Sequence, residues 1–184
     1  LLSLCQSMRS TKLETTGHKL TNASVGFYDF GKIQGRYFGL LAKILNGSHV
    51  THAGLILEAG GKEYHFVICS AKQEWDGRIV PVSKLYNLET LQGLGAVLIG
   101  RTEMWITEDM SLGDAITGAS SYTDSNAWDM IFHYFVGRFI GLTRPRNCTT
   151  HICSFFNIED CFTPAELYRR FNDNHLIVRP SASR

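Results

Sequence analysis

The sequence predicts an α+β fold in which a small antiparallel sheet packs against helices, and three stretches carry this prediction. Two apolar runs, at 53–57 and 63–69, flank a Gly-Gly turn at 60–61, which is typical of a β-hairpin. Residues 163–166 (Thr-Pro-Ala-Glu) form a capping box that opens a helix. Residues 127–140 are apolar and aromatic on more than one face, which favours a buried helix.

The other expected elements follow from local patterns. An apolar repeat at helical spacing predicts a helix over 36–45, which the next residues, Asn-Gly, end. Apolar runs predict strands at 78–82 and 96–99, and a capped helix is expected over 107–119. The capping-box helix should run through Phe171, and residues 175–178 are expected to form a last strand. Within 63–69, strand alternation places one set of side chains on a common face: Glu63, His65, Val67 and Cys69.

Length and composition indicate a single folded unit. A chain of 184 residues and 20.7 kDa suits one domain with a substantial core. Residues 1–24 are rich in Ser, Thr and Lys and are expected to form an irregular arm, with one folded domain over 25–184. No internal repeat or low-complexity stretch divides that domain.

The charge pattern excludes some partners. The charged fraction is 19% and the formal net charge is +1, so the chain has no basic footprint for nucleic acid. It has no run of about 18 apolar residues, so we expect no transmembrane segment. The sequence indicates neither a cofactor nor an oligomeric state.

The five cysteines are odd in number, so at least one has no intramolecular disulfide partner. Cys148, Cys153 and Cys161 lie close to His151, which raises a zinc site as an alternative. Their intervals lack the paired C-x-x-C or H-x-x-x-H spacing that local tetrahedral sites use. We therefore expect no metal.

Cys153 is the candidate nucleophile. It lies where the turn-prone stretch 144–150 gives way to an apolar run, so we expect it in the first turn of a helix. Backbone N–H groups and the helix dipole would stabilise a thiolate there and donate to an oxyanion. The alternative is a buried cysteine that packs as a small hydrophobic residue.

His52 is the candidate base, because it opens an apolar strand that would hold its imidazole in a fixed place. A structural or solvent-facing histidine is the alternative. A Cys–His pair needs a third group to orient the imidazole. His65 on the next strand is the favoured third residue, with Glu63 and Cys69 as rivals.

Five segments in consistent order resemble the permuted branch of the NlpC/P60 superfamily, which contains the YiiX-like and lecithin:retinol acyltransferase-like proteins. The first is the strand Thr-His-Ala-Gly-Leu-Ile at 51–56, and the second is the Asp-Gly to Ser-Lys-Leu stretch at 76–85. The others are Trp-Asp-Met-Ile-Phe at 128–132, Cys-Ser-Phe-Phe at 153–156 and Thr-Pro-Ala-Glu-Leu-Tyr at 163–168.

The resemblance implies a circularly permuted papain-like fold, with the base before the nucleophile in the chain. It implies a cysteine hydrolase of amidase or peptidase type, or an acyl transferase, which forms a thioester on Cys153 with His52 as base. Substrates within the superfamily include small peptides, peptidoglycan and lipid acyl groups, and we favour amide bonds here. In the retinol acyltransferase branch the third residue is a histidine, which suits His65, whereas the YiiX-like glutamate falls on Cys69. The alternative is a catalytically silent papain-like protein that binds a host or virion partner.

Overall fold

The computed structural model describes the sheet, three helices and several shorter segments. The described residues are 17–32, 40, 43–44, 47–75, 78–103, 109–115, 132, 136, 139–141, 148–158 and 163–180, and for 68–75, 78–85 and 151 only the backbone is described.

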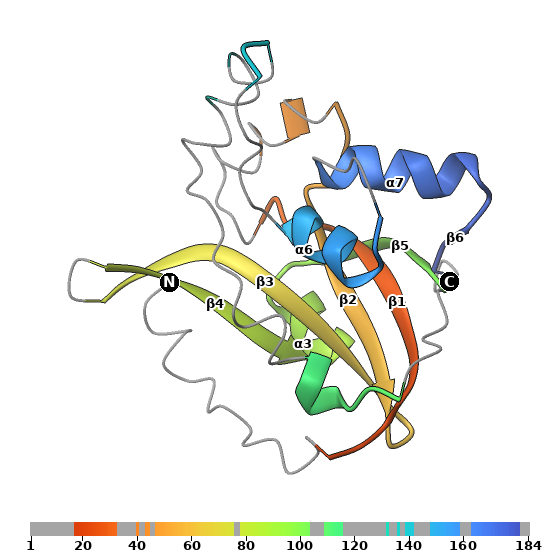
Figure 1. Ribbon diagram of the computed structural model, residues 1–184. Coiled ribbons are helices and arrows are strands. Elements are labelled where there is room, and N and C mark those ends of the chain that lie inside the picture. The colour runs from red at the N-terminus through yellow and green to blue at the C-terminus, as the bar shows by residue number, and fades with distance from the viewer. Residues whose placement is uncertain are drawn as a thin grey trace.

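One antiparallel sheet organises these residues, with strand order β4-β3-β2-β1-β5-β6 (Figure 1). The strands are β1 (Leu20–Asp29), β2 (His52–Ala59), β3 (Lys62–Trp75), β4 (Arg78–Tyr86), β5 (Val97–Thr102) and β6 (Ile177–Val178). The helices are α3 (Leu88–Gly93), α6 (Cys148–Phe155) and α7 (Pro164–Asp173). The predicted α+β class is confirmed, and so are the strands predicted at 78–82, 96–99 and 175–178, with shifted bounds.

The predicted hairpin is the β2–β3 pair. Gly60 and Gly61 both have positive φ (58° and 72°), a conformation that glycine adopts without steric cost, and they join the strands. The register pairs Leu55 with Phe66 and Ile56 with His65. Each strand is longer than predicted.

The N-terminal arm expected over 1–24 is wrong for its last five residues. Residues 20–24 form the first half of β1, a central strand that pairs with β2 along its length. Ala23 and Val25 are fully buried, and Ser24 is buried as well. Because β1 is covered on both faces, its residues do not alternate between polar and apolar. The polar residues of 20–24 therefore hid the strand in the sequence. Residues 1–16 lie outside the described part of the chain.

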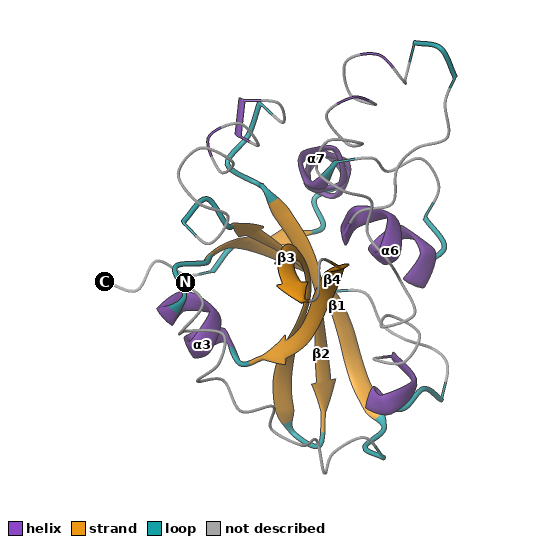
Figure 2. Cartoon of the chain, turned by 90° about the vertical axis from the view of Figure 1, so that its left-hand side faces the viewer, coloured by secondary structure: helices purple, strands orange, loops and turns teal. Residues whose placement is uncertain are grey.

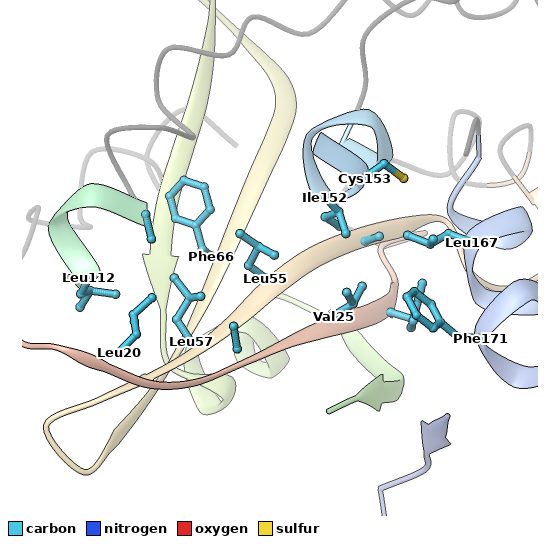
Figure 3. Close-up of a cluster of buried hydrophobic side chains, with 14 of the residues drawn as sticks. Leu20, Val25, Leu55, Leu57, Phe66, Leu112, Ile152, Cys153, Leu167 and Phe171 are labelled. Atoms are coloured by element: carbon cyan, nitrogen blue, oxygen red, sulfur yellow. The ribbon is translucent and has the colours of Figure 1, made fainter. Parts of the chain in front are cut away.

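The sheet is covered on both faces (Figure 2). On one face, here called the α6 face, Val25, Leu55 and Leu57 belong to a cluster that also contains Ile152 of α6 and Leu167 and Phe171 of α7 (Figure 3). On the other, the α3 face, Tyr28 and Val67 form a second cluster with Leu91 of α3. Successive strand residues point to opposite faces, so the sequence assigns each side chain to one of the two clusters.

The helix ends follow local chemistry. The Thr163 side chain accepts from the Glu166 N–H and the Glu166 carboxylate accepts from the Thr163 N–H, which confirms the predicted capping box of α7. The sequence did not predict α3. Its signal is Asn87, which caps the helix by accepting from the Thr90 N–H at 2.7 Å. The expected helices over 36–45 and 127–140 lie mostly outside the described residues, and so do both ends of the segment expected over 107–119, of which 109–115 is described.

Candidate functional site

Cys153 does not lie in the first turn of a helix, so that prediction is wrong. α6 begins at Cys148, and Cys153 is its sixth residue. The N–H groups of Ile158 and Asn157 bond back to the carbonyls of Cys153 (2.7 Å) and Ser154 (3.3 Å), and Asn157 has a φ of 51°. This is the Schellman arrangement that ends a helix, so Cys153 lies near the C-terminal end, where the dipole disfavours a thiolate.

Cys153 is also buried. Only 6% of it is exposed, and it belongs to the cluster on the α6 face with Ile152 and Ala53 (Figure 3). Its position is that of a cysteine packed as a small hydrophobic residue, the alternative raised by the sequence.

His52 is the first residue of β2, as predicted, and it points toward the α3 face. Its Cα partner is Tyr28, and its ring stacks on Phe30 with centroids 4.5 Å apart and planes 5° apart. The Nε2 atom is buried without a hydrogen-bond partner. Burial lowers the pKa of His52 from 6.5 to about 3, because the imidazolium form would be desolvated there.

The structure does not bring Cys153 and His52 together. Ala53 contributes to the same cluster as Cys153, and His52, its neighbour along the strand, points the opposite way. The two side chains therefore lie on opposite faces of the sheet. A sequence pattern does not reveal this, because it fixes spacing along the chain but not the face on which a distant helix packs.

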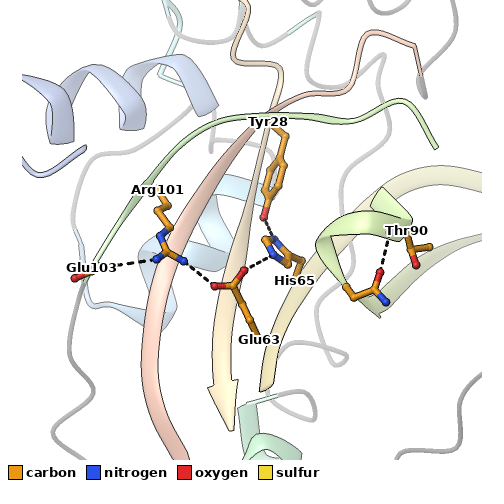
Figure 4. Close-up of polar contacts among 7 residues, drawn as sticks. Tyr28, Glu63, His65, Thr90, Arg101 and Glu103 are labelled. Atoms are coloured by element: carbon orange, nitrogen blue, oxygen red, sulfur yellow. Dashed lines mark hydrogen bonds and ion pairs between the residues drawn. The ribbon is translucent and has the colours of Figure 1, made fainter. Parts of the chain in front are cut away.

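His65 belongs to a polar network on the α3 face (Figure 4). Its Nδ1 lies 2.7 Å from the Tyr28 hydroxyl, and its Nε2 lies 2.9 Å from Glu63 Oε1. Arg101 donates from Nη1 to the other Glu63 oxygen at 2.7 Å. Both ring nitrogens of His65 are thus engaged by residues other than His52, so His65 does not orient the His52 ring.

The hydrogen-bond geometry assigns the proton positions in this network. The ionised carboxylate of Glu63 only accepts, so Nε2 of His65 carries the hydrogen and Nδ1 accepts from Tyr28. Burial lowers the pKa of His65, although Glu63 opposes this effect. Burial also raises the pKa of Tyr28 well above its usual value, so the phenol stays protonated. The network therefore joins the buried, neutral Tyr28–His65 pair to the partly exposed ion pair of Glu63 and Arg101.

Two glycines allow close packing, Gly26 against the Tyr28 ring and Gly54 against the backbone of β3. Gly26 and Gly54 are Cα partners on β1 and β2. A Cβ on Gly26 would lie 2.3 Å from the Tyr28 hydroxyl oxygen, and one on Gly54 would lie 2.8 Å from the Phe66 carbonyl oxygen. Gly54, part of the Thr-His-Ala-Gly stretch singled out in the sequence, therefore has a packing role.

The rival third residues lie on β3. Glu63 bonds to His65 and Arg101 as described. For Cys69 the backbone alone is described, and it pairs with Val82.

Cys148 is the other cysteine of α6, and the sequence analysis did not consider it as a nucleophile. As the first residue of α6 it lies at the positive end of the helix dipole, and it is partly exposed. Neither Cys148 nor Cys153 forms a disulfide. The Cys148 sulfur lies 3.9 Å from the Thr149 hydroxyl. The sequence signal for the end of this helix is Asn157, a residue type that tolerates the left-handed conformation found at helix C-termini.

Within the described ranges no group of three or more His, Cys, Asp or Glu side chains is placed to hold a metal ion. Cys161, part of the zinc alternative, lies outside those ranges. No helix in the described part of the chain is long and apolar enough to span a membrane.

Comparison with known proteins finds no matching protein family, no matching curated protein and no matching solved structure.

Proposed function

We propose that the protein is a thiol hydrolase or acyl transferase of papain-like type, with Cys148 as the nucleophile in place of Cys153. The observation that carries this proposal is the position of Cys148, partly exposed and first in α6. The positive end of the helix dipole favours the thiolate form, which is the nucleophilic form of cysteine.

The proposed reaction proceeds through a thioester. The Cys148 thiolate attacks the carbonyl carbon of an amide or ester, and the amine or alcohol leaves with a proton. Water, or an acceptor alcohol or amine, then attacks the thioester and releases the thiol. We retain amide bonds as the favoured substrate class.

The placement of His52 weakens its assignment as the base. A general base must lie within hydrogen-bond reach of the thiol or of a bridging water, and His52 faces away from α6. This observation favours a second candidate function, the catalytically silent papain-like binding protein.

Activity-based labelling separates the two functions. Peptide and lipid-ester electrophiles would be applied to the wild-type protein, to Cys148→Ala and to Cys153→Ala. The proposal expects covalent labelling of the wild type and of Cys153→Ala, and loss of labelling in Cys148→Ala. Equal labelling of all three proteins, or no labelling of the wild type, would overturn the hydrolase proposal.

His52→Ala would be tested in the same assay. If His52 acts as the base after a rearrangement, labelling falls while circular dichroism reports a folded protein. If labelling is unchanged, another group serves as the base.

A further inference from the structure

Two buried histidines, His52 and His65, lie on the α3 face and are joined by aromatic rings. The exposed fractions are 4% for His52 and 0% for His65. Between them lie Tyr28 and Phe30, whose ring centroids are 5.5 Å apart. The His65 ring lies 6.0 Å from Tyr28, and the His52 ring stacks on Phe30 at 4.5 Å. A displacement of either middle ring therefore changes the surroundings of both histidines.

The hydrogen bonds of His65 fit its neutral form. Nδ1 accepts from the Tyr28 hydroxyl at 2.7 Å, and Nε2 donates to Glu63 (Figure 4). A second proton would make Nδ1 a donor, so the Tyr28 hydroxyl would have to turn its hydrogen away. The hydroxyl has no room to move toward β1, because it lies over Gly26, where an added Cβ would overlap it. Protonation of His65 therefore opposes the packing of Tyr28.

Packing also holds His52 in its neutral form. The ring is stacked on Phe30 with the planes 5° apart, and its Nε2 is buried without a hydrogen-bond partner. A positive charge there would be desolvated and unpaired, which costs free energy. Burial accordingly lowers the pKa of both histidines.

The charged groups around the two rings are paired or exposed. The titratable side chains on this face are Tyr28 of β1, Glu63 of β3, Tyr86 of β4 and Arg101 of β5. Glu63 is the group that offsets a positive charge on His65, and it is already paired with Arg101 at 2.7 Å. Glu89 of α3 and Lys32, which lies beside the turn after α3, are exposed.

The helix α3 closes this face with little buried surface of its own. It has six residues and buries Leu91, which packs in one cluster with Tyr28 and Phe30. Short elements of this kind open locally at a lower free energy than the core. Once α3 has moved away, each imidazole meets water and regains a pKa of about 6.5, so it takes up a proton below that pH. Acid therefore favours the open form.

We propose that the α3 face is an acid-sensitive switch, in which α3 moves away from the sheet as the pH falls and His52 and His65 are protonated together. The coupling follows from the contacts between the rings, because Leu91, Tyr28 and Phe30 must separate before either imidazole meets water. Opening therefore takes up two protons. This inference does not depend on the proposed catalytic activity.

Hydrogen exchange at single amides, followed by NMR, tests the switch. The reporter is the Leu91 amide, which bonds to the Asn87 carbonyl, and the reference is the Leu167 amide of α7, which bonds to the Thr163 carbonyl. After correction for intrinsic exchange rates, the Leu91 opening constant should rise about 600-fold from pH 7 to pH 5, about 25-fold for each histidine. Low urea should hardly change this opening, whereas it should speed exchange at Leu167, which requires global unfolding.

Variants assign the two protons. His52→Phe keeps the stacked ring, and His65→Gln keeps a neutral side chain that both accepts and donates. Each variant should retain a rise of about 25-fold, and the double variant almost none. His175→Asn is the matched control, because His175 is exposed and follows α7, and it should behave like the wild type. Circular dichroism at pH 7 confirms that each variant is folded.

The wild-type protein alone can overturn the proposal. Equal opening constants and equal urea dependence at Leu91 and Leu167 would mean that the α3 face opens only when the whole protein unfolds. A rise of about 25-fold or less at Leu91 would show that the two histidines are not protonated together. Among the variants, a double variant that keeps the full rise would show that other groups take up the protons.

Discussion

His52 and His65 show how burial determines the chemistry of an imidazole. Both rings are buried on the α3 face of the sheet, and burial lowers the pKa of each. The two histidines on this face therefore differ: His65 belongs to a hydrogen-bonded network, whereas Nε2 of His52 has no partner.

The low pKa of His52 predicts a loss of stability in mild acid. The unfolded chain takes up a proton near pH 6.5, and the folded chain does so only near pH 3. Between these values the unfolded state binds more protons, so the free energy of unfolding falls by about 1.4 kcal/mol per pH unit as the pH decreases. The depressed pKa of His65 acts in the same direction.

The variant His52→Phe keeps an aromatic ring against Phe30 and removes the titrating group. Denaturant unfolding at pH 7 and pH 5 should show a smaller loss of stability for His52→Phe than for the wild type, by about 2 kcal/mol. Equal losses in the two proteins would contradict the buried, neutral placement of His52.

At the scale of elements, the packing of Tyr28 over β1 requires a residue without a side chain at Gly26. Gly26→Ala should destabilise the protein by about 1–3 kcal/mol, because the added Cβ would overlap the Tyr28 ring. Gly93→Ala is the matched control, since a Cβ at Gly93 meets no atom within 4 Å. Its stability should change by less than about 1 kcal/mol in thermal unfolding. A similar response to both substitutions would show that Tyr28 does not lie over Gly26.

The sequence predicted elements well where a local signal was complete. The Gly-Gly turn identified β2–β3, and the Thr-Pro-Ala-Glu box identified the start of α7. The sequence prediction failed for β1, because burial on both faces removes the polar–apolar alternation of a strand. It also failed for the start of α6, because the polar residues that suggested a turn include the first residues of this helix. The candidate site was affected most, since Cys153 was expected in the first turn of a helix but lies near the C-terminal end of α6, which begins five residues earlier.

At the scale of the whole molecule, the arrangement of the two faces decides which residues meet. α6 and α7 cover one face, and the Tyr28–His65–Glu63 network lies on the other, reaching the surface at Arg101 (Figures 2 and 4). No local pattern in the sequence specifies this, because the packing face of α6 depends on contacts with strands about one hundred residues earlier in the chain. The proposed catalytic centre is therefore sought on the α6 face.

The rate at which each cysteine reacts with iodoacetamide tests the central proposal most directly. Site-resolved mass spectrometry would compare Cys148 and Cys153 in the folded protein and in urea, where both thiols are exposed. The account predicts that folded Cys148 reacts faster than in urea, because the helix dipole favours its thiolate, and that folded Cys153 reacts far more slowly, because it is buried. Faster labelling of Cys153 than of Cys148 in the folded protein would contradict the assignment of Cys148 as the nucleophile.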